Sequence, residues 1–450
     1  MWNKNVVTIL ICILSTCISA PTCPLEGPVF PKPAQLAENE TVKGAIANLT
    51  TIFANITAEA TNYPIAIEAF SAGNHAPLFS VTHTAPKLVT QNSTGARKVD
   101  SNTVLRLRSL TKTYTIYAFL INAGGKVWNK PITKYVPELQ ALANRSDPVA
   151  HALLGELTQT KEIRDNVLEY GFPPLNEADR PPCGAYTMRS RAGYALETIT
   201  GNSFESLLED TVIKPLGLDN TFLKAPEDSR GIIPGNKTAT GWAFDIGESA
   251  AAGNMYASVA DVSALGRAIL NYELLSPVMT RRWLKPFPFS PNPKALVGMP
   301  WGARRINLRQ PYRHVKGANE IVDVIGESLL PAIEEAARAE AGALYNGHYV
   351  SSDSSMNSSM TITTNEKPGL SIIQWLSNGM DFGLIATVLQ NDYSPVTPSI
   401  SVYPTGLEGR RWKTENKMFS TDCGTCITVE FVIYGSTAMD ELIFDLASSG

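Results

Sequence analysis

Apolar and polar positions follow two different periods in the first part of the chain. Between residues 40 and 60 apolar side chains recur every three or four positions, which is the period of an amphipathic helix; they are Val42, Ile46, Leu49, Phe53 and Ile56. Residues 65–69 and 78–81 alternate instead between apolar and polar or smaller side chains, with a Ser-Ala-Gly-Asn break between them. The pattern predicts a helix of about 40–60 followed by a strand pair.

Residues 104–125 combine a short alternating run with a longer, mostly apolar run that ends at Gly124 and Gly125. The alternating run predicts a strand, and the longer apolar run predicts a helix that ends at the two glycines. If the helix begins at Ser109, Lys112 lies one turn later on the same face, so its ammonium can reach the serine hydroxyl. Unpaired N–H groups at the helix start could hold an oxyanion. The same residues also fit an ordinary helix start, because serine is a preferred N-cap and such lysines are usually solvated.

The later parts of the chain have a different pattern. Residues 126–139 contain two prolines and are predicted to run over the surface. From about residue 341 a Ser/Asn-rich loop is followed by short strand-like runs, which predict a small antiparallel β domain without identifiable chemistry. These runs are 360–364, 370–376, 383–389, 400–403 and 427–434.

Composition narrows the classes of function. The 450 residues are 18% charged with a formal net charge of −4, so there is no basic footprint for nucleic acid and no polybasic patch for a membrane surface. The five histidines are scattered, and the Cys423-Gly-Thr-Cys426 pair has no second pair at metal spacing. We therefore expect no metal and no cofactor. The length of the chain suits one large domain plus a smaller one.

The N-terminus has the features of a secretory signal peptide. Residues 1–20 contain Lys4, an apolar run from Val6 to Ile18 and a small-residue end, and no later run is long enough to span a membrane. We expect a secreted, glycosylated protein. Four cysteines stay after cleavage and allow three disulfide connectivities; they are Cys23, Cys183, Cys423 and Cys426. The glycosylation sequons begin at Asn39, Asn48, Asn55, Asn92, Asn144, Asn236 and Asn357.

An Arg-x-x-Ser-x-x-Lys helix followed by Pro-Ile-Thr-Lys-Tyr-Val-Pro-Glu-Leu at 131–139 resembles the serine β-lactamase and penicillin-binding-protein superfamily, nearest the secreted fungal, class C-like members. Further blocks occur in the family's order at 193–197, 200–208, 214–221, 252–270 and 297–301. The resemblance implies an α+β fold, an αβα sandwich of an antiparallel sheet with helices, over residues 21–340. Residues 341–450 would form the C-terminal β domain.

The resemblance also implies roles for individual residues. Ser109 would attack an ester, amide or lactone carbonyl of a small molecule, and Lys112 would handle the proton. The family's Tyr-x-Asn motif is altered here: Tyr186 stands at a plausible place, but Met188 replaces the asparagine. With its phenolate favoured by Lys112, Tyr186 could act as general base, and it fits an ordinary loop tyrosine equally well.

The second departure lies near the family's Lys-Ser/Thr-Gly strand, which forms the far wall of the site. Lys316 and Gly317 resemble a remnant of that substrate-binding motif, but residues 318–330 already have the pattern of the final helix. We therefore expect some sheet strands to be missing, as in a degenerate member or a faulty gene model. The alternatives to an enzyme are a catalytically inactive secreted glycoprotein that uses the fold for binding and, resting on the sequons alone, a cell-surface structural glycoprotein.

Overall fold

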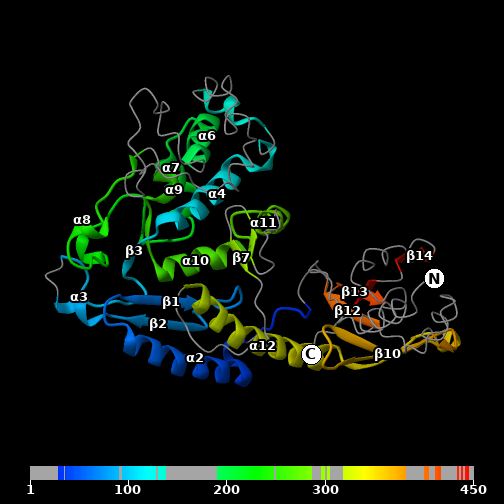
Figure 1. Cartoon of the computed structure of the whole chain (residues 1–450). Coiled ribbons are helices and arrows are strands. Elements are labelled where there is room, and N and C mark those ends of the chain that lie inside the picture. Colours follow the sequence, from blue (N-terminus) through cyan, green and yellow to red (C-terminus); the bar gives the residue numbers. More distant parts are fainter. Residues whose placement is uncertain are drawn as a thin grey trace, which may run out of the picture. The chain divides into compact units, whose positions relative to one another are not determined.

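The computed structural model describes residues 29–34, 36–90, 94–127, 130–137, 190–247, 250–285, 295–298, 302–304, 318–381, 400–404, 411–416, 433–434, 437–438 and 441–444. The chain divides into two compact units (Figure 1). One unit comprises residues 46–328, and the other comprises residues 1–45 together with 329–450.

The first predicted helix and strand pair are confirmed. Helix α2 (Glu40–Glu59) buries Leu49 and Phe53, and strands β1 (Ile65–Ala69) and β2 (Phe79–His83) pair antiparallel. Phe53 lies 5.3 Å from Phe79, ring centre to ring centre, so α2 covers the face of the hairpin that Phe79 presents. Helix α10 (Val259–Leu270) contacts β1, and its Gly266 packs against the ring of Phe70. Because side chains alternate between the faces of a strand, α10 lies on the face opposite α2.

The segment with Ser109 runs from a strand into the central helix of this unit. Strand β3 (Val104–Arg106) belongs to a three-stranded antiparallel sheet of order β3-β5-β4, with β5 at Tyr256–Ser258 and β4 at Thr221–Phe222. A 3₁₀ turn, Arg108–Leu110, follows β3, and helix α4 (Thr111–Asn122) begins after it. Residues 111–120 are all buried. The predicted helix is present, but it begins two residues later than Ser109.

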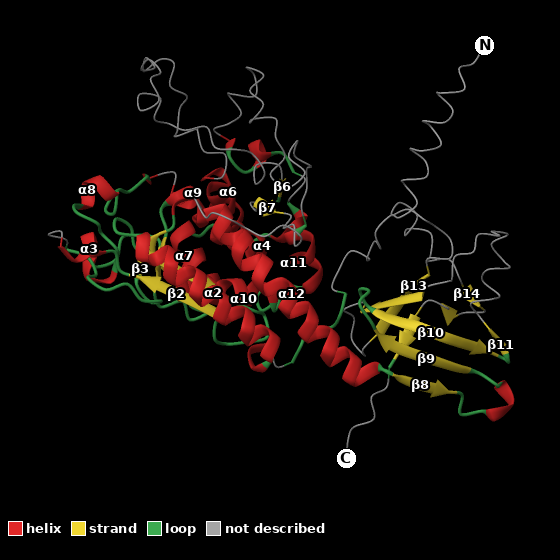
Figure 2. Ribbon diagram, turned by 60° about the horizontal axis from the view of Figure 1, so that its bottom comes forward, coloured by secondary structure: helices red, strands yellow, loops and turns green. Residues whose placement is uncertain are grey.

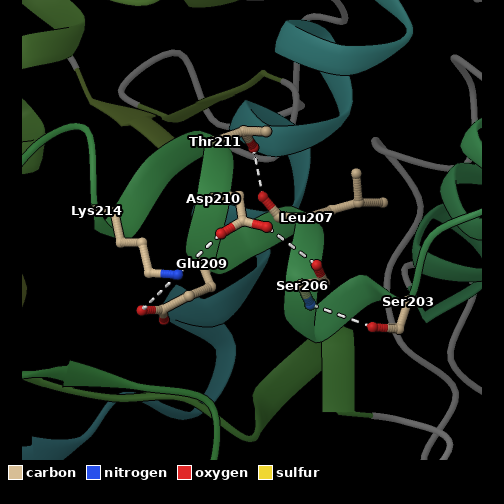
Figure 3. A network of polar contacts seen from close by, with 7 residues as sticks. All are labelled: Ser203, Ser206, Leu207, Glu209, Asp210, Thr211 and Lys214. Carbon is tan, nitrogen blue, oxygen red and sulfur yellow. Dashed lines mark hydrogen bonds and ion pairs between the residues drawn. The ribbon is translucent and has the colours of Figure 1, made fainter.

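Helices α6 (Ser190–Thr200), α7 (Phe204–Leu208), α9 (Ala250–Gly253) and α11 (Pro277–Leu284) accompany α4 in the largest apolar core. Figure 3 shows the polar contacts that fix α7 and the π-helical turn Glu209–Ile213 after it. The Ser203 hydroxyl caps α7 by accepting from the Ser206 N–H, and Asp210 accepts from the hydroxyl of Ser206 and from Lys214. Thr211 accepts a hydrogen bond from Asn122 of α4 at 3.1 Å, which ties this turn to the end of the central helix.

The segment after α4 differs from its prediction. The two prolines indicated a surface course, yet Ile132 is fully buried and Val136 is 8% exposed, and both belong to the core around α4. A short 3₁₀ helix, Ile132–Lys134, directs these two side chains inward. The surface prediction was therefore wrong for the apolar residues, because burial against a large core outweighs the local tendency of proline to end regular structure.

Strands β6 (Ala295–Val297) and β7 (Gly302–Arg304) form an antiparallel pair, and helix α12 occupies Ala318–Tyr345. The helix predicted directly after Gly317 is thus confirmed. Smaller described elements within residues 46–328 are α3 (Pro86–Thr90) and α8 (Lys237–Thr240). Among the described helices, none is long and apolar enough to cross a membrane.

The C-terminal unit contains an antiparallel sheet of order β16-β13-β12-β10-β9-β8, with β11 paired to β10 (Figure 2). The predicted strands at 360–364, 370–376 and 400–403 are confirmed, whereas 383–389 and much of 427–434 lie outside the described residues. Apolar side chains of the sheet and of α12 form a separate core, which includes Leu370 and Val402. The strands are β8 (Gly347–Val350), β9 (Ser359–Thr364), β10 (Leu370–Ser377), β11 (Met380–Asp381), β12 (Ile400–Pro404), β13 (Arg411–Asn416), β14 (Ile433–Tyr434), β15 (Thr437–Ala438) and β16 (Glu441–Ile443).

Candidate active site

Ser109 and Lys112 are in direct contact. The Lys112 Nζ donates a hydrogen bond to the Ser109 Oγ at 2.9 Å. Ser109 is exposed, whereas the lysine is only 1% exposed. A long charged side chain is almost never buried to this extent unless it is paired. The arrangement therefore differs from an ordinary helix start: Ser109 is not the N-cap of α4, and Lys112 is not a solvated surface lysine.

Main-chain groups of α9 and of Met255 just after it hold the beginning of α4. The Ala252 carbonyl accepts a second hydrogen bond from Lys112 at 2.7 Å, and the Ala251 carbonyl accepts one from the Thr115 hydroxyl at 2.6 Å. Met255 donates its N–H to the Thr111 hydroxyl at 3.1 Å. Three buried polar side chains at the start of α4 thereby have hydrogen-bond partners in the interior, as buried polar groups require. These contacts fix the lysine relative to the serine.

The backbone just before Ser109 adopts an unusual conformation. Arg108 has a φ of 48°, in the left-handed region that residues other than glycine rarely occupy. The Leu107 N–H donates to the Met255 carbonyl at 2.8 Å, which anchors the strand side of this turn. Strained residues of this kind cluster at functional sites, because the surrounding structure must hold them in place. The turn presents Ser109 at the surface, within the 3₁₀ turn that leads into α4.

Arg106 lies near the site. In the sequence it stands out only as the arginine of the Arg-x-x-Ser-x-x-Lys motif. Its guanidinium donates to the Gly241 carbonyl and, at 3.3 Å, to the Asn254 Oδ1. It also lies 5.9 Å from the ring centre of Phe244 and 5.4 Å from that of Tyr256. Arg106 thus fastens the loop 241–247 to the strand that leads to Ser109. Gly241 lies 135 residues away along the chain, so the sequence offered no signal for this contact.

Asn254 connects this loop to a hollow next to α9. Its Oδ1 also accepts from the Ile246 N–H at 3.3 Å, and its Nδ2 donates to the Leu223 carbonyl at 3.0 Å. The hollow has a volume of about 290 Å³, and Asn254 and Ala251 form part of its wall. The lining is mixed polar and apolar, with Tyr194, Glu197, Glu205, Lys224 and Asp245.

The other predicted site residues are placed as follows. Tyr186, Lys316 and Gly317 lie outside the described residues, as do the four cysteines and the sequons at Asn92 and Asn144. Asn48, Asn55, Asn236 and Asn357 are exposed, and Asn39 is half-buried because its Oδ1 caps α2 by accepting from the N–H groups of Thr41 and Val42. The structure therefore brings together Ser109 and Lys112 of the predicted catalytic residues. In the part of the chain that the structure describes, no group of three or more His, Cys, Asp or Glu side chains could hold a metal ion.

Comparisons with known proteins agree with this architecture. Residues 185–314 match the family "Beta-lactamase", and residues 337–450 match the family "Beta-lactamase-like-like, C-terminal domain". A "Beta-lactamase-like protein" of Arthroderma benhamiae is 26% identical, covering 74% of this chain and 71% of the relative. "Probable hydrolase clz13" of Cochliobolus lunatus is 24% identical, covering 83% and 76%. A solved structure, the octameric penicillin-binding protein homologue from Pyrococcus abyssi, is 12% identical with a TM-score of 0.44, covering 89% of this chain and 96% of its own.

The β-lactamase match covers α6 to β7 of the helical unit, and the second match covers the end of α12 and the C-terminal sheet. These parts of the chain are similar to proteins of the serine β-lactamase and penicillin-binding-protein-like superfamily. The fold of the chain is the β-lactamase/transpeptidase-like combination of helices and antiparallel strands, with a small C-terminal sheet.

Proposed function

We propose that the protein is a secreted serine hydrolase or acyltransferase that cleaves a small ester, amide or lactone through an acyl-enzyme on Ser109. The observation that carries the proposal is the 2.9 Å contact between the Ser109 Oγ and the Nζ of a lysine that is 1% exposed. A serine is a weak nucleophile until an adjacent group takes its proton, and a fixed amine is one such group. The superfamily acts on substrates of this type, and the two family matches support the assignment.

In the proposed reaction, Lys112 takes part as the neutral amine: the Ser109 oxygen attacks the carbonyl carbon while its proton passes to the Lys112 nitrogen, directly or through Tyr186. The carbonyl double bond opens to an oxyanion, for which the backbone N–H of Ser109, in the turn before α4, is a suitable donor. Collapse of this intermediate expels the alcohol or amine, which takes up the proton. Attack by water on the acyl-enzyme completes hydrolysis, and attack by a second alcohol or amine completes transfer. The residues require no cofactor for either course.

The test is covalent labelling of the purified protein with a fluorophosphonate and with a penicillin. We expect labelling of the wild-type protein, its loss in Ser109→Ala and its persistence in Ser352→Ala, which removes another exposed serine hydroxyl. Labelling that survives in Ser109→Ala would reject Ser109 as the nucleophile.

A second candidate is a secreted glycoprotein that keeps the fold for binding without catalysis. The observation in its favour is that α12 begins at Ala318, directly after Lys316 and Gly317, so the space in the sequence for strands of the far wall is short. A well-folded protein that neither probe labels, and that hydrolyses no ester, would support this candidate over the enzyme.

A further inference from the structure

A second hollow lies away from Ser109, between the β1–β2 connection and the C-terminal end of α10. Its volume is about 310 Å³, which is at the lower end of the range for small-molecule sites. None of the residues around Ser109 lines it. The side chains that give it chemical character are Asn74, His75, Arg267, Asn271 and Glu273.

Arg267 lines this hollow, and none of the other lining residues accepts a hydrogen bond from its guanidinium. Its side chain is half-buried, and its Nη1 is buried with no hydrogen-bond partner. Within the described residues the guanidinium forms neither an ion pair nor a hydrogen bond. Glu273 lines the same hollow without approaching within ion-pair distance. Buried polar atoms are nearly always satisfied, so this guanidinium at a concave surface calls for an acceptor that the described residues do not supply.

The carbonyl groups at the end of α10 do not fill this need. A cation in the last turn of a helix is favoured by the helix dipole, which explains why an arginine is tolerated there. However, the nearest carbonyls already accept from backbone N–H groups: Arg267 O from Asn271 at 2.8 Å, Ala268 O from Glu273 at 3.1 Å and Ile269 O from Tyr272 at 3.2 Å. The guanidinium itself donates to none of them.

We propose that this hollow binds a small carboxylate, with the Arg267 guanidinium as its anchor. The planar guanidinium fork matches the two oxygens of a carboxylate. Asn74, His75 and Asn271 supply further polar groups around the same space. The carboxylate of Glu273 disfavours a dianion such as phosphate by like-charge repulsion and offers an acceptor for an ammonium. A ligand with one carboxylate, and in particular one that also carries an amine, fits this charge pattern.

The test is a calorimetric titration of the full chain with acetate, glycine and inorganic phosphate. Chloride at equal ionic strength is the control. We expect saturable binding of acetate, binding of glycine at least as tight, and weaker binding of phosphate. Arg267→Gln should weaken acetate binding by about tenfold or more, because it removes a charge-assisted hydrogen bond. Arg97→Gln, an identical change at an exposed arginine, should leave it unchanged. Glu273→Gln should remove the preference for glycine over acetate.

Ala264→Met is a second variant that fills the hollow without changing its charge, in case Arg267→Gln does not fold. Its circular dichroism should match the wild type while acetate binding is lost. An acetate response equal to that of chloride, or one that neither variant changes, would overturn the proposal. Phosphate binding tighter than acetate binding would overturn the assignment to carboxylates.

Discussion

At the scale of single residues, the account depends on a lysine whose side-chain nitrogen is held in the interior by two oxygen atoms. Lys112 donates both to the Ser109 hydroxyl and to the Ala252 carbonyl. The carbonyl orients the lysine, and the lysine in turn contacts the hydroxyl. The neighbouring Thr115 donates a similar hydrogen bond to the Ala251 carbonyl but does not contact Ser109. A substitution of Thr115 therefore tests the packing of α4 without removing a group that contacts the serine.

Replacing Lys112 by methionine keeps the length and the apolar stem of the side chain but removes the amine. We expect the rate of Ser109 acylation to fall by about 10²–10⁴-fold, which is the usual contribution of a positioned proton-transfer group. The rate of fluorophosphonate labelling measures this loss. The control is Thr115→Val, which leaves the Ala251 carbonyl unpaired and should lower the free energy of unfolding by about 1–3 kcal/mol. If Thr115→Val slowed labelling as much as Lys112→Met, the effect would be one of packing.

Tyr117 provides a prediction for alkaline pH. Burial raises the pKa of Tyr117 to about 12, from about 10 in an unfolded chain. Between these values the unfolded chain loses the phenol proton and the folded chain keeps it, so the free energy of unfolding falls as pH rises through this window. By pH 11, about one unit above the unfolded pKa, Tyr117→Phe should reduce that fall by about 1 kcal/mol, at about 1.4 kcal/mol per pKa unit. Urea unfolding at pH 8 and pH 11 measures it, with exposed Tyr63→Phe as the control. An equal effect of the two substitutions would contradict the assignment to burial.

At the scale of elements, close packing of α10 on the β1–β2 hairpin depends on a residue without a side chain. A Cβ at Gly266 would lie 2.1 Å from the Phe70 ring, whereas a Cβ at Gly44 of α2 would meet nothing within 4 Å. Alanine is favoured over glycine in a helix by about 1 kcal/mol in both positions. At Gly44 both helix propensity and the free space favour alanine. At Gly266 helix propensity favours alanine, but the Phe70 ring leaves no space for its methyl group.

We expect Gly266→Ala to destabilise the protein by about 1–3 kcal/mol through overpacking and Gly44→Ala to stabilise it by up to about 1 kcal/mol. Urea unfolding followed by circular dichroism measures both free energies. A stabilising effect of Gly266→Ala would show that α10 does not rest on Phe70.

Much of the element pattern could be predicted from the sequence, and the exceptions have identifiable physical causes. The period of Leu49 and Phe53 predicted α2, since one face of that helix is buried and the other exposed. Ile132 was assigned to the surface because prolines flank it, but its burial depends on a core assembled from distant helices. The 3₁₀ turn at Arg108–Leu110 could not be foreseen either, because an arginine with positive φ has no local sequence signal. The contact of Ser109 with Lys112 was predictable, since it needs only the spacing of one helical turn.

At the scale of the whole molecule, the proposal of secretion makes a separate prediction. Three sequons lie on or next to α2, and those at Asn48 and Asn55 are seven residues apart, two helical turns, with both side chains exposed. The buried Leu49 and Phe53 face the protein interior, so glycans at these asparagines would project away from it. The exposed sites at Asn236 and Asn357 are equally compatible with glycans.

Expression in a fungal secretory host should give a medium-borne protein whose first residue is Pro21 and whose mass falls on treatment with a peptide N-glycosidase. Mass spectrometry of the peptides should show deamidation at Asn48 and Asn55 after this treatment. Retention of residues 1–20, or the absence of glycan at every exposed sequon, would contradict the proposed compartment.

The two family matches indicate that the chain joins a β-lactamase-type unit to a C-terminal sheet, but a fold alone does not fix a reaction. The central claim is that Ser109 carries the acyl group. The most direct measurement is mass spectrometry of the protein quenched during incubation with a p-nitrophenyl ester, followed by peptide mapping. The account predicts an acyl adduct on Ser109 that forms with release of nitrophenolate and is absent from Ser109→Ala and Lys112→Met. Nitrophenolate release without an adduct, or an adduct on another residue, would contradict it.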